Sequence, residues 1–110
     1  MNSSVDLTNL RAIIEDDKAL EKMLFEEFLN SSRKNITDLA NSMEDSASTT
    51  WRESAHALKG NSLNLGAMQL SELCKKAQNE HTAPKTVKEE ILQNIRAEYQ
   101  LVCDFVLTQI

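Results

Sequence analysis

One histidine stands in a pattern that could do chemistry on phosphorus. Residues 55–60 read Ala-His-Ala-Leu-Lys-Gly, so Lys59 and Gly60 follow His56 at the two spacings that share one face of a helix. An exposed imidazole titrates near ~6.5, and its abundant neutral form is a good nucleophile. A phosphoryl group adds about −1.5 to −2 charges, which a neighbouring ammonium offsets. The pattern predicts that His56 accepts a phosphoryl group beside Lys59.

The ring of His56 should point away from the protein core. The apolar stripe of its helix comprises Trp51, Ala55 and Leu58. At about 100° per residue, His56 falls roughly 130° from the centre of that stripe. Gly60 costs roughly 1 kcal/mol relative to alanine in a helix, and the bare surface it leaves would let another protein approach the ring. We call the expected exposed surface the His56 ridge; it comprises His56, Lys59, Gly60 and Leu63.

A metal site is the first competing interpretation. Glu53-x-x-His56 matches one element of a di-iron helical bundle, which needs two such elements and two further glutamates. The other histidine in the chain, His81, has Gln78 three residues before it instead of a glutamate. The second element is missing, so we expect no bound metal.

Composition predicts that helices position these residues. The chain has 110 residues with only two glycines, one proline and 5% aromatic residues, which disfavours a sheet with many tight turns. Good helix formers such as Ala, Leu, Glu and Lys are abundant. We therefore predict an all-α fold and a single domain spanning residues 1–110.

Apolar residues recur at helical spacing in five segments. These are about 6–15, 18–43, 51–66, 67–79 and 85–110. Asp6 is the expected N-cap of the first segment. The polar run 44–50 offers several N-caps for the third segment, including a Thr50-x-x-Glu53 capping box. Gly66 suits a left-handed turn residue. The simplest assembly is an antiparallel up-and-down four-helix bundle with a short additional N-terminal helix lying across it.

Charge and segment composition exclude several classes of protein. The net charge is −5 and no basic stripe is present, which argues against nucleic acid binding. No run of about 18 apolar residues and no secretory signal layout occurs, so we expect a cytoplasmic protein away from the membrane. Cys74 and Cys103 form no C-x-x-C pair and are expected to be small buried hydrophobes. We expect a monomer with protein partners.

Residues 56–74 resemble the signature of the histidine-containing phosphotransfer (HPt) domain family of two-component phosphorelays. The resemblance is to the signature H-x-L-K-G, then five residues, G, three residues, L, three residues, C. The matching positions are His56, Leu58, Lys59, Gly60, Gly66, Leu70 and Cys74. Asn61 departs from the small residue that is common after the family's first glycine.

The resemblance implies a function and a site. Family members accept a phosphoryl group from an aspartyl phosphate on one receiver domain, hold it on histidine Nε2 and pass it to another receiver. His56 would be the acceptor, Lys59 would lie beside the phosphoryl group, Gly60 would give the receiver access, and Gln78 would hydrogen-bond the imidazole. The implied partners are receiver domains of a hybrid sensor kinase and of a response regulator.

No ATP-binding loop or kinase motif is present, so the chain would be a phosphotransfer intermediate and not an enzyme, with no cofactor of its own and Mg²⁺ in the partner receiver. The second competing interpretation is a helical adaptor that binds receivers without being phosphorylated. The intact His56, Lys59 and Gly60 argue against it.

Overall fold

The computed structural model describes residues 4–110, and within them it contains helices and no strands. The helices are α1 (Thr8–Ile13), α2 (Lys18–Ala40), the short 3₁₀ helix η1 (Asp45–Ala47), α3 (Ser48–Leu65), α4 (Met68–Asn79) and α5 (Lys85–Gln109). The predicted all-α class is confirmed.

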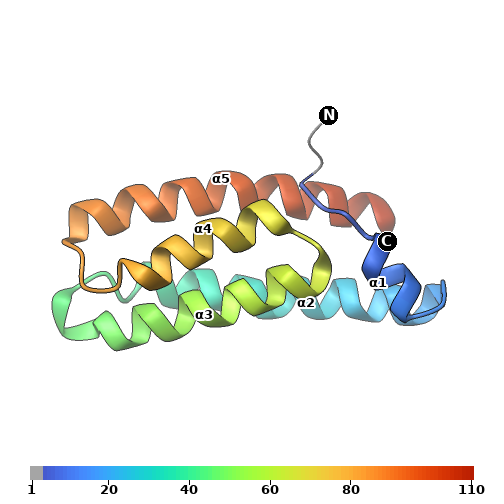
Figure 1. The fold of residues 1–110 in the computed structure, drawn as a ribbon, viewed down its shortest axis with the longest axis horizontal. Coiled ribbons are helices and arrows are strands. Elements are labelled where there is room, and N and C mark those ends of the chain that lie inside the picture. Colours follow the sequence, from blue (N-terminus) through green and yellow to red (C-terminus); the bar gives the residue numbers. More distant parts are fainter. Residues whose placement is uncertain (1–3) are drawn as a thin grey trace.

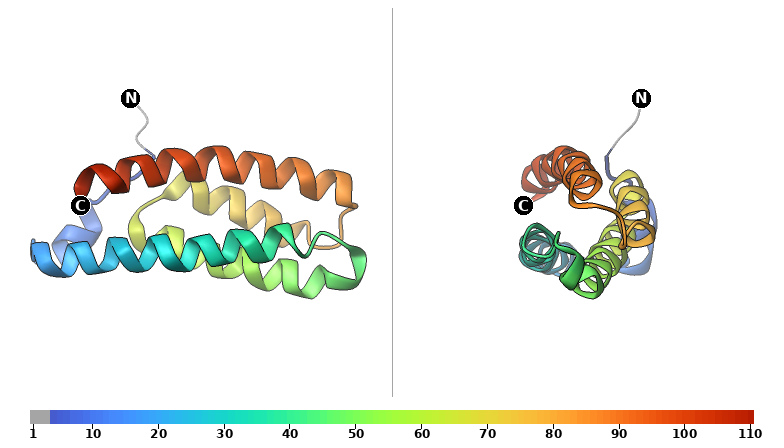
Figure 2. Two further views of the ribbon diagram at one scale, coloured as in Figure 1. Left: turned by 180° about the vertical axis from the view of Figure 1, so that it is seen from behind. Right: turned by 90° about the vertical axis from the view of Figure 1, so that its left-hand side faces the viewer.

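The four long helices lie side by side along the 44 Å axis of the molecule (Figure 1). Chain direction reverses at each connection from α2 to α5. α3 packs against α2 and α4, and α5 packs against α4 and α2, so the end-on view shows the four around one centre (Figure 2). α1 lies at one end of this group, beside the C-terminus (Figure 1).

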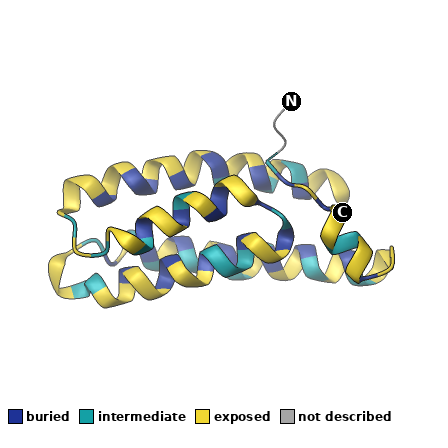
Figure 3. Ribbon diagram, viewed as in Figure 1, coloured by how far each residue is buried: buried dark blue, intermediate teal, exposed yellow. Residues whose placement is uncertain are grey.

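Each long helix buries one face and exposes the other, as the 3.6-residue period requires (Figure 3). The largest fully buried side chains of the core include Phe25 and Leu39 of α2, Trp51 and Leu58 of α3, and Leu70, Ile95, Val102 and Val106 of α4 and α5. The predicted stripe of α3 is therefore confirmed. It is this burial that fixes which face of α3 remains in solvent.

Three helix boundaries differ from the sequence-based predictions. α1 begins at Thr8, so its N-cap position is Leu7 and not the predicted Asp6. The carboxylate of Asp6 still accepts a hydrogen bond from the N–H of Thr8 at 3.0 Å. α2 ends at Ala40, three residues before the predicted end at Met43. The hydroxyl of Ser42 donates to the main-chain carbonyl of Asp38 at 2.6 Å, one of the last carbonyls of the helix, which have no intrahelical donor. The prediction of a capping box at Thr50 is wrong. The 3₁₀ helix η1 leads directly into α3, which begins at Ser48, so Thr50 lies inside the helix.

Gly66 makes the reversal between α3 and α4, as predicted. Its φ of 98° is left-handed. The N–H of Gly66 donates to Leu63 O (3.1 Å) and that of Ala67 to Ser62 O (2.8 Å), the pair of bonds that defines a Schellman motif. This turn brings α4 back along α3, so that residues on the two helices can meet.

Candidate functional site

The His56 ridge lies on the solvent side of α3. His56 is exposed, Lys59 and Gly60 are half-buried, and Leu63 is 46% exposed. The prediction that the imidazole is accessible to water is confirmed. An incoming reactant can therefore reach the ring from outside without any part of the fold opening.

Trp51 anchors α3 beneath this ridge. Its ring is fully buried, and its Nε1–H donates to the main-chain oxygen of Ala77 on α4 at 2.8 Å. An indole N–H in a core needs such an acceptor, because an unpaired buried donor is costly. The bond fixes α3 against α4 five residues before His56.

Gln78 of α4 reaches the imidazole of His56. Its Oε1 lies 3.4 Å from Nδ1 of His56, a long hydrogen bond between partly exposed groups. An amide oxygen can only accept, so Nδ1 carries the proton in this arrangement. The neutral ring then has its free lone pair on Nε2. The contact between Gln78 and the imidazole that the family resemblance implies is present in the structure.

Lys59 supplies a positive charge one turn from His56. No carboxylate in residues 4–110 lies within salt-bridge distance of its ammonium, so the charge is not neutralised by a partner. Burial raises the pKa of the Cys74 thiol on α4 to about 12, and the charge of Lys59 opposes that rise. Cys74 therefore stays a protonated, buried thiol.

Gly60 leaves open space beside the ring. Apart from the backbone of its own helix, a β-carbon built on Gly60 would meet no heavy atom of residues 4–110 within 4 Å. Nothing in this part of the chain therefore requires glycine at this position, where alanine is favoured by about 1 kcal/mol in a helix. The bare surface predicted from the sequence is present in the fold.

Asn61, which departs from the family pattern, does not belong to the exposed surface. Its Nδ2 donates to Oδ1 of Asn35 on α2 at 2.8 Å, and the pair is partly buried. The residue therefore helps to hold α2 against α3. The His56 ridge keeps its small-residue surface at Gly60.

One sequence-based prediction about other residues was wrong, and one contact was not predicted. His81, for which no contact was predicted, is half-buried, with Nδ1 3.1 Å from the main-chain oxygen of Gln78. Its position three residues after Gln78, just past a helix end, was the available signal, because helix ends have carbonyls without donors. Cys103 is only partly buried, unlike Cys74.

Residues 4–110 hold no group of three or more His, Cys, Asp or Glu side chains close enough to share a metal ion. In the same residues, no helix combines the length and apolar character needed to cross a bilayer.

Two comparisons with known proteins found a match to this chain. A family model described as Hpt domain matches residues 23–104. The crystal structure of histidine-containing phosphotransfer protein B (HptB) from Pseudomonas aeruginosa PAO1 is similar in fold, with a TM-score of 0.84 and 20% sequence identity over 99% of this chain and 96% of that chain. No curated protein matches the sequence.

Proposed function

The chain belongs to the Hpt domain family, whose members carry out histidine phosphotransfer in two-component phosphorelays, and we propose that His56 is the residue that holds its phosphoryl group. Hpt domains interact with receiver domains and are carriers of phosphoryl groups. The observation that supports the assignment is the exposed ring of His56 with its Nδ1 held by Gln78, which leaves Nε2 as the free nucleophilic nitrogen.

The reaction is a pair of reversible displacements. Nε2 of His56 attacks the phosphorus of an aspartyl phosphate on a receiver, the P–O bond to the aspartate breaks, and the carboxylate leaves with the electron pair. A carboxylate of a second receiver then attacks the same phosphorus and the N–P bond breaks. Oε1 of Gln78 accepts the hydrogen bond from Nδ1–H throughout and stabilises the positive charge that the ring gains on phosphorylation.

Lys59 and Gly60 complete the proposed site. The ammonium of Lys59 offsets the charge of the phosphoryl oxygens by charge-assisted hydrogen bonding. The open space at Gly60 lets the receiver bring its aspartyl phosphate up to the ring, with the phosphorus between the aspartate oxygen and Nε2. Leu63, which is exposed on the same ridge, supplies apolar contact area to the receiver.

In the proposed protein the four long helices form an antiparallel up-and-down bundle, with α1 as a short additional helix. The chain acts as a monomeric, cytoplasmic intermediate and not as an enzyme, between receiver domains of a hybrid sensor kinase and of a response regulator. It binds no cofactor, and the Mg²⁺ that the reaction needs is held by the receiver.

Transfer of label tests the proposal directly. A receiver that carries radiolabelled aspartyl phosphate should pass acid-labile label to the wild-type chain but not to His56→Ala or His56→Gln. An adaptor that only binds receivers would take up no label. Persistent label on both variants would assign the phosphoryl group to another residue.

A further inference from the structure

The last turn of α4 is held by two ring N–H donors. The final carbonyls of a helix have no intrahelical donor and need partners from elsewhere. The main-chain oxygen of Ala77 accepts Trp51 Nε1–H at 2.8 Å, and the oxygen of Gln78 accepts His81 Nδ1–H at 3.1 Å. The residue that touches the His56 imidazole is therefore held at its own main chain by a second histidine.

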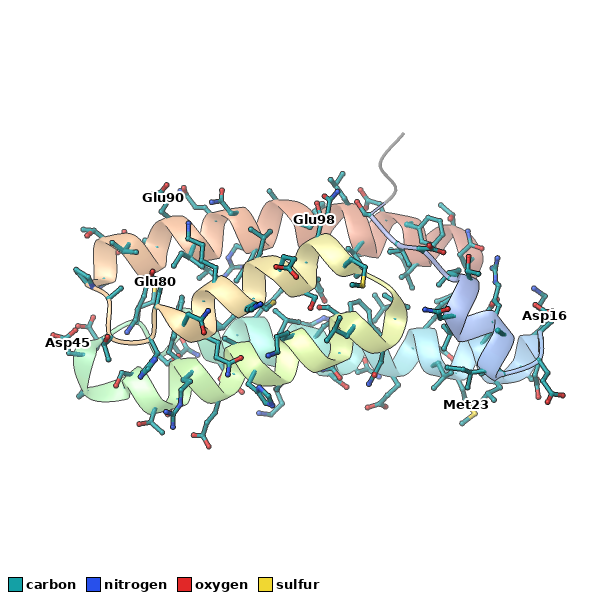
Figure 4. The ribbon with its side chains drawn as sticks, in the orientation of Figure 1. Asp16, Met23, Asp45, Glu80, Glu90 and Glu98 are labelled. Atoms are coloured by element: carbon teal, nitrogen blue, oxygen red, sulfur yellow. The ribbon has the colours of Figure 1, made fainter. Side chains whose placement is uncertain are left out.

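The two donors reach α4 from different segments. Trp51 belongs to α3 and is buried, so it fixes the helix end against the helix that carries His56. His81 belongs to the connection after α4, in a turn that the Ala83 N–H closes on the Glu80 carbonyl (2.9 Å). Figure 4 labels Glu80 at this end of α4, next to the start of α5.

We propose that His81 is a positioning residue for His56 and acts through Gln78. By capping the Gln78 carbonyl, His81 keeps the last turn of α4 helical, so that Oε1 of Gln78 stays at the Nδ1 atom of His56. Without this donor the end of α4 frays, because terminal turns are the least stable parts of a helix. His56 then populates the tautomer whose Nε2 carries the proton and cannot attack phosphorus. The inference rests on the proposed role of His56.

Three variants separate this role from general stability. His81→Ala removes the donor. His81→Asn keeps an amide N–H where the ring has Nδ1, and it should rescue the site. Thr82→Ala is the matched control, since Thr82 is exposed in the same turn.

The first readout needs no phosphoryl donor. Nitrogen-15 NMR of the 110-residue chain reports which nitrogen of neutral His56 carries the proton. Wild type, His81→Asn and Thr82→Ala should favour Nδ1–H, whereas His81→Ala should shift towards the Nε2–H tautomer of free histidine.

The second readout is the rate of phosphorylation by phosphoramidate, in which the P–N bond of the reagent breaks, ammonia leaves and the bond from Nε2 of His56 to phosphorus forms. His81→Ala should react about 2- to 10-fold more slowly, the factor that the loss of one hydrogen bond produces. His81→Asn should react at the wild-type rate.

The outcomes separate the two proposals. A wild-type tautomer and rate in His81→Ala would overturn the role of His81, and so would a free-histidine tautomer in a folded His81→Asn chain. The tautomer of His56 in the His81→Asn chain tests the role of His81 even if His81→Ala unfolds. Phosphorylation that persists in His56→Ala would instead refute the assignment of His56, while the tautomer measurement would still report on His81.

Discussion

The main chain of Asp6 occupies the space that a side chain on Gly66 would need. A β-carbon on Gly66 would overlap the carbonyl oxygen of Asp6, and the Asp6 N–H donates to the Gly66 carbonyl at 3.0 Å. The segment that leads into α1 is thus packed against the turn that joins α3 to α4. Gly66 serves both the left-handed turn and this close approach.

Gly66→Ala should therefore destabilise the fold strongly. A left-handed backbone costs a non-glycine residue roughly 1–2 kcal/mol, and the overlap with Asp6 forces the N-terminal segment to move, so we expect a loss of about 2–4 kcal/mol. Urea unfolding followed by circular dichroism measures it. A loss below about 0.5 kcal/mol would mean that the segment before α1 moves aside freely.

Gly60→Ala should have the opposite effect on stability. The added methyl group meets no side chain or neighbouring helix within residues 4–110, and alanine is the better helix former, so the free energy of unfolding should rise by up to ~1 kcal/mol. Transfer from a phosphorylated receiver should slow, whereas phosphorylation by small phosphoramidate should not. Equal rates from the receiver in the variant and in wild type would remove the proposed reason for glycine.

Lys59→Ala should slow phosphoryl transfer without unfolding the chain. The ammonium is one helical turn from His56 and has no salt-bridge partner in residues 4–110. Its loss therefore removes positive charge from the site and changes the free energy of unfolding little. A hydrogen bond to a charged group is worth roughly 1.5–3 kcal/mol, which corresponds to about 10-fold or more in rate. Transfer kinetics should recover in Lys59→Arg, and an unchanged rate in Lys59→Ala would count against the role.

The periodicity of apolar residues was sufficient to predict the helices and the outward direction of His56. Trp51, Ala55 and Leu58 are fully buried, and this alone sets the opposite face of α3 in solvent. The C-terminal helix begins at Lys85 as predicted, because Pro84 cannot continue a helix from before it. Apolar periodicity and proline positions thus predict features that depend only on neighbouring residues in the sequence.

Contacts between distant segments could not be predicted in this way. The bond from Trp51 to Ala77 and the packing of Asp6 on Gly66 depend on how α3, α4 and the N-terminal segment fit in space. Thr50 has the residue type of a cap, but the preceding 3₁₀ turn moved the start of α3 to Ser48. Residue types alone do not show which of several possible caps a helix uses.

Lys88 should be replaceable by an apolar residue with a gain in stability. Its side chain on α5 is fully buried, with Nζ 5.5 Å from the centre of the Trp51 ring and no hydrogen-bond acceptor within the described part of the chain. Burial of an ammonium is costly, and a cation–π contact returns only about 2 kcal/mol of that cost. Lys88→Met should raise the free energy of unfolding by about 1–3 kcal/mol in urea titrations.

Lys88→Ala is the matched control, because it removes the charge but leaves a cavity in the core. It should be less stable than Lys88→Met. If Lys88→Met were destabilised as much as Lys88→Ala, the ammonium itself would contribute to the core through its contact with Trp51.

The ion pair of Arg11 and Glu21 should make stability depend on pH. Nε of Arg11 on α1 donates to Oε1 of Glu21 on α2 at 2.7 Å, and the Glu21 side chain is 7% exposed. This hydrogen bond lowers the pKa of the Glu21 carboxyl below its ordinary value of 4.5. A carboxyl with a lowered pKa contributes stability above its unfolded-state pKa, and that contribution is lost as the pH falls through the folded-state pKa.

The free energy of unfolding should accordingly fall as the pH drops from neutral to below the ordinary glutamate pKa. Glu21→Gln should cost about 1 kcal/mol at pH 7 and make the fall at acid pH shallower. Glu26→Gln, which removes the same charge from an exposed position on α2, should stay within about 0.5 kcal/mol of wild type at pH 7. Urea titrations at several pH values measure both variants. Parallel curves for Glu21→Gln and wild type would show that the pair does not hold α1 against α2.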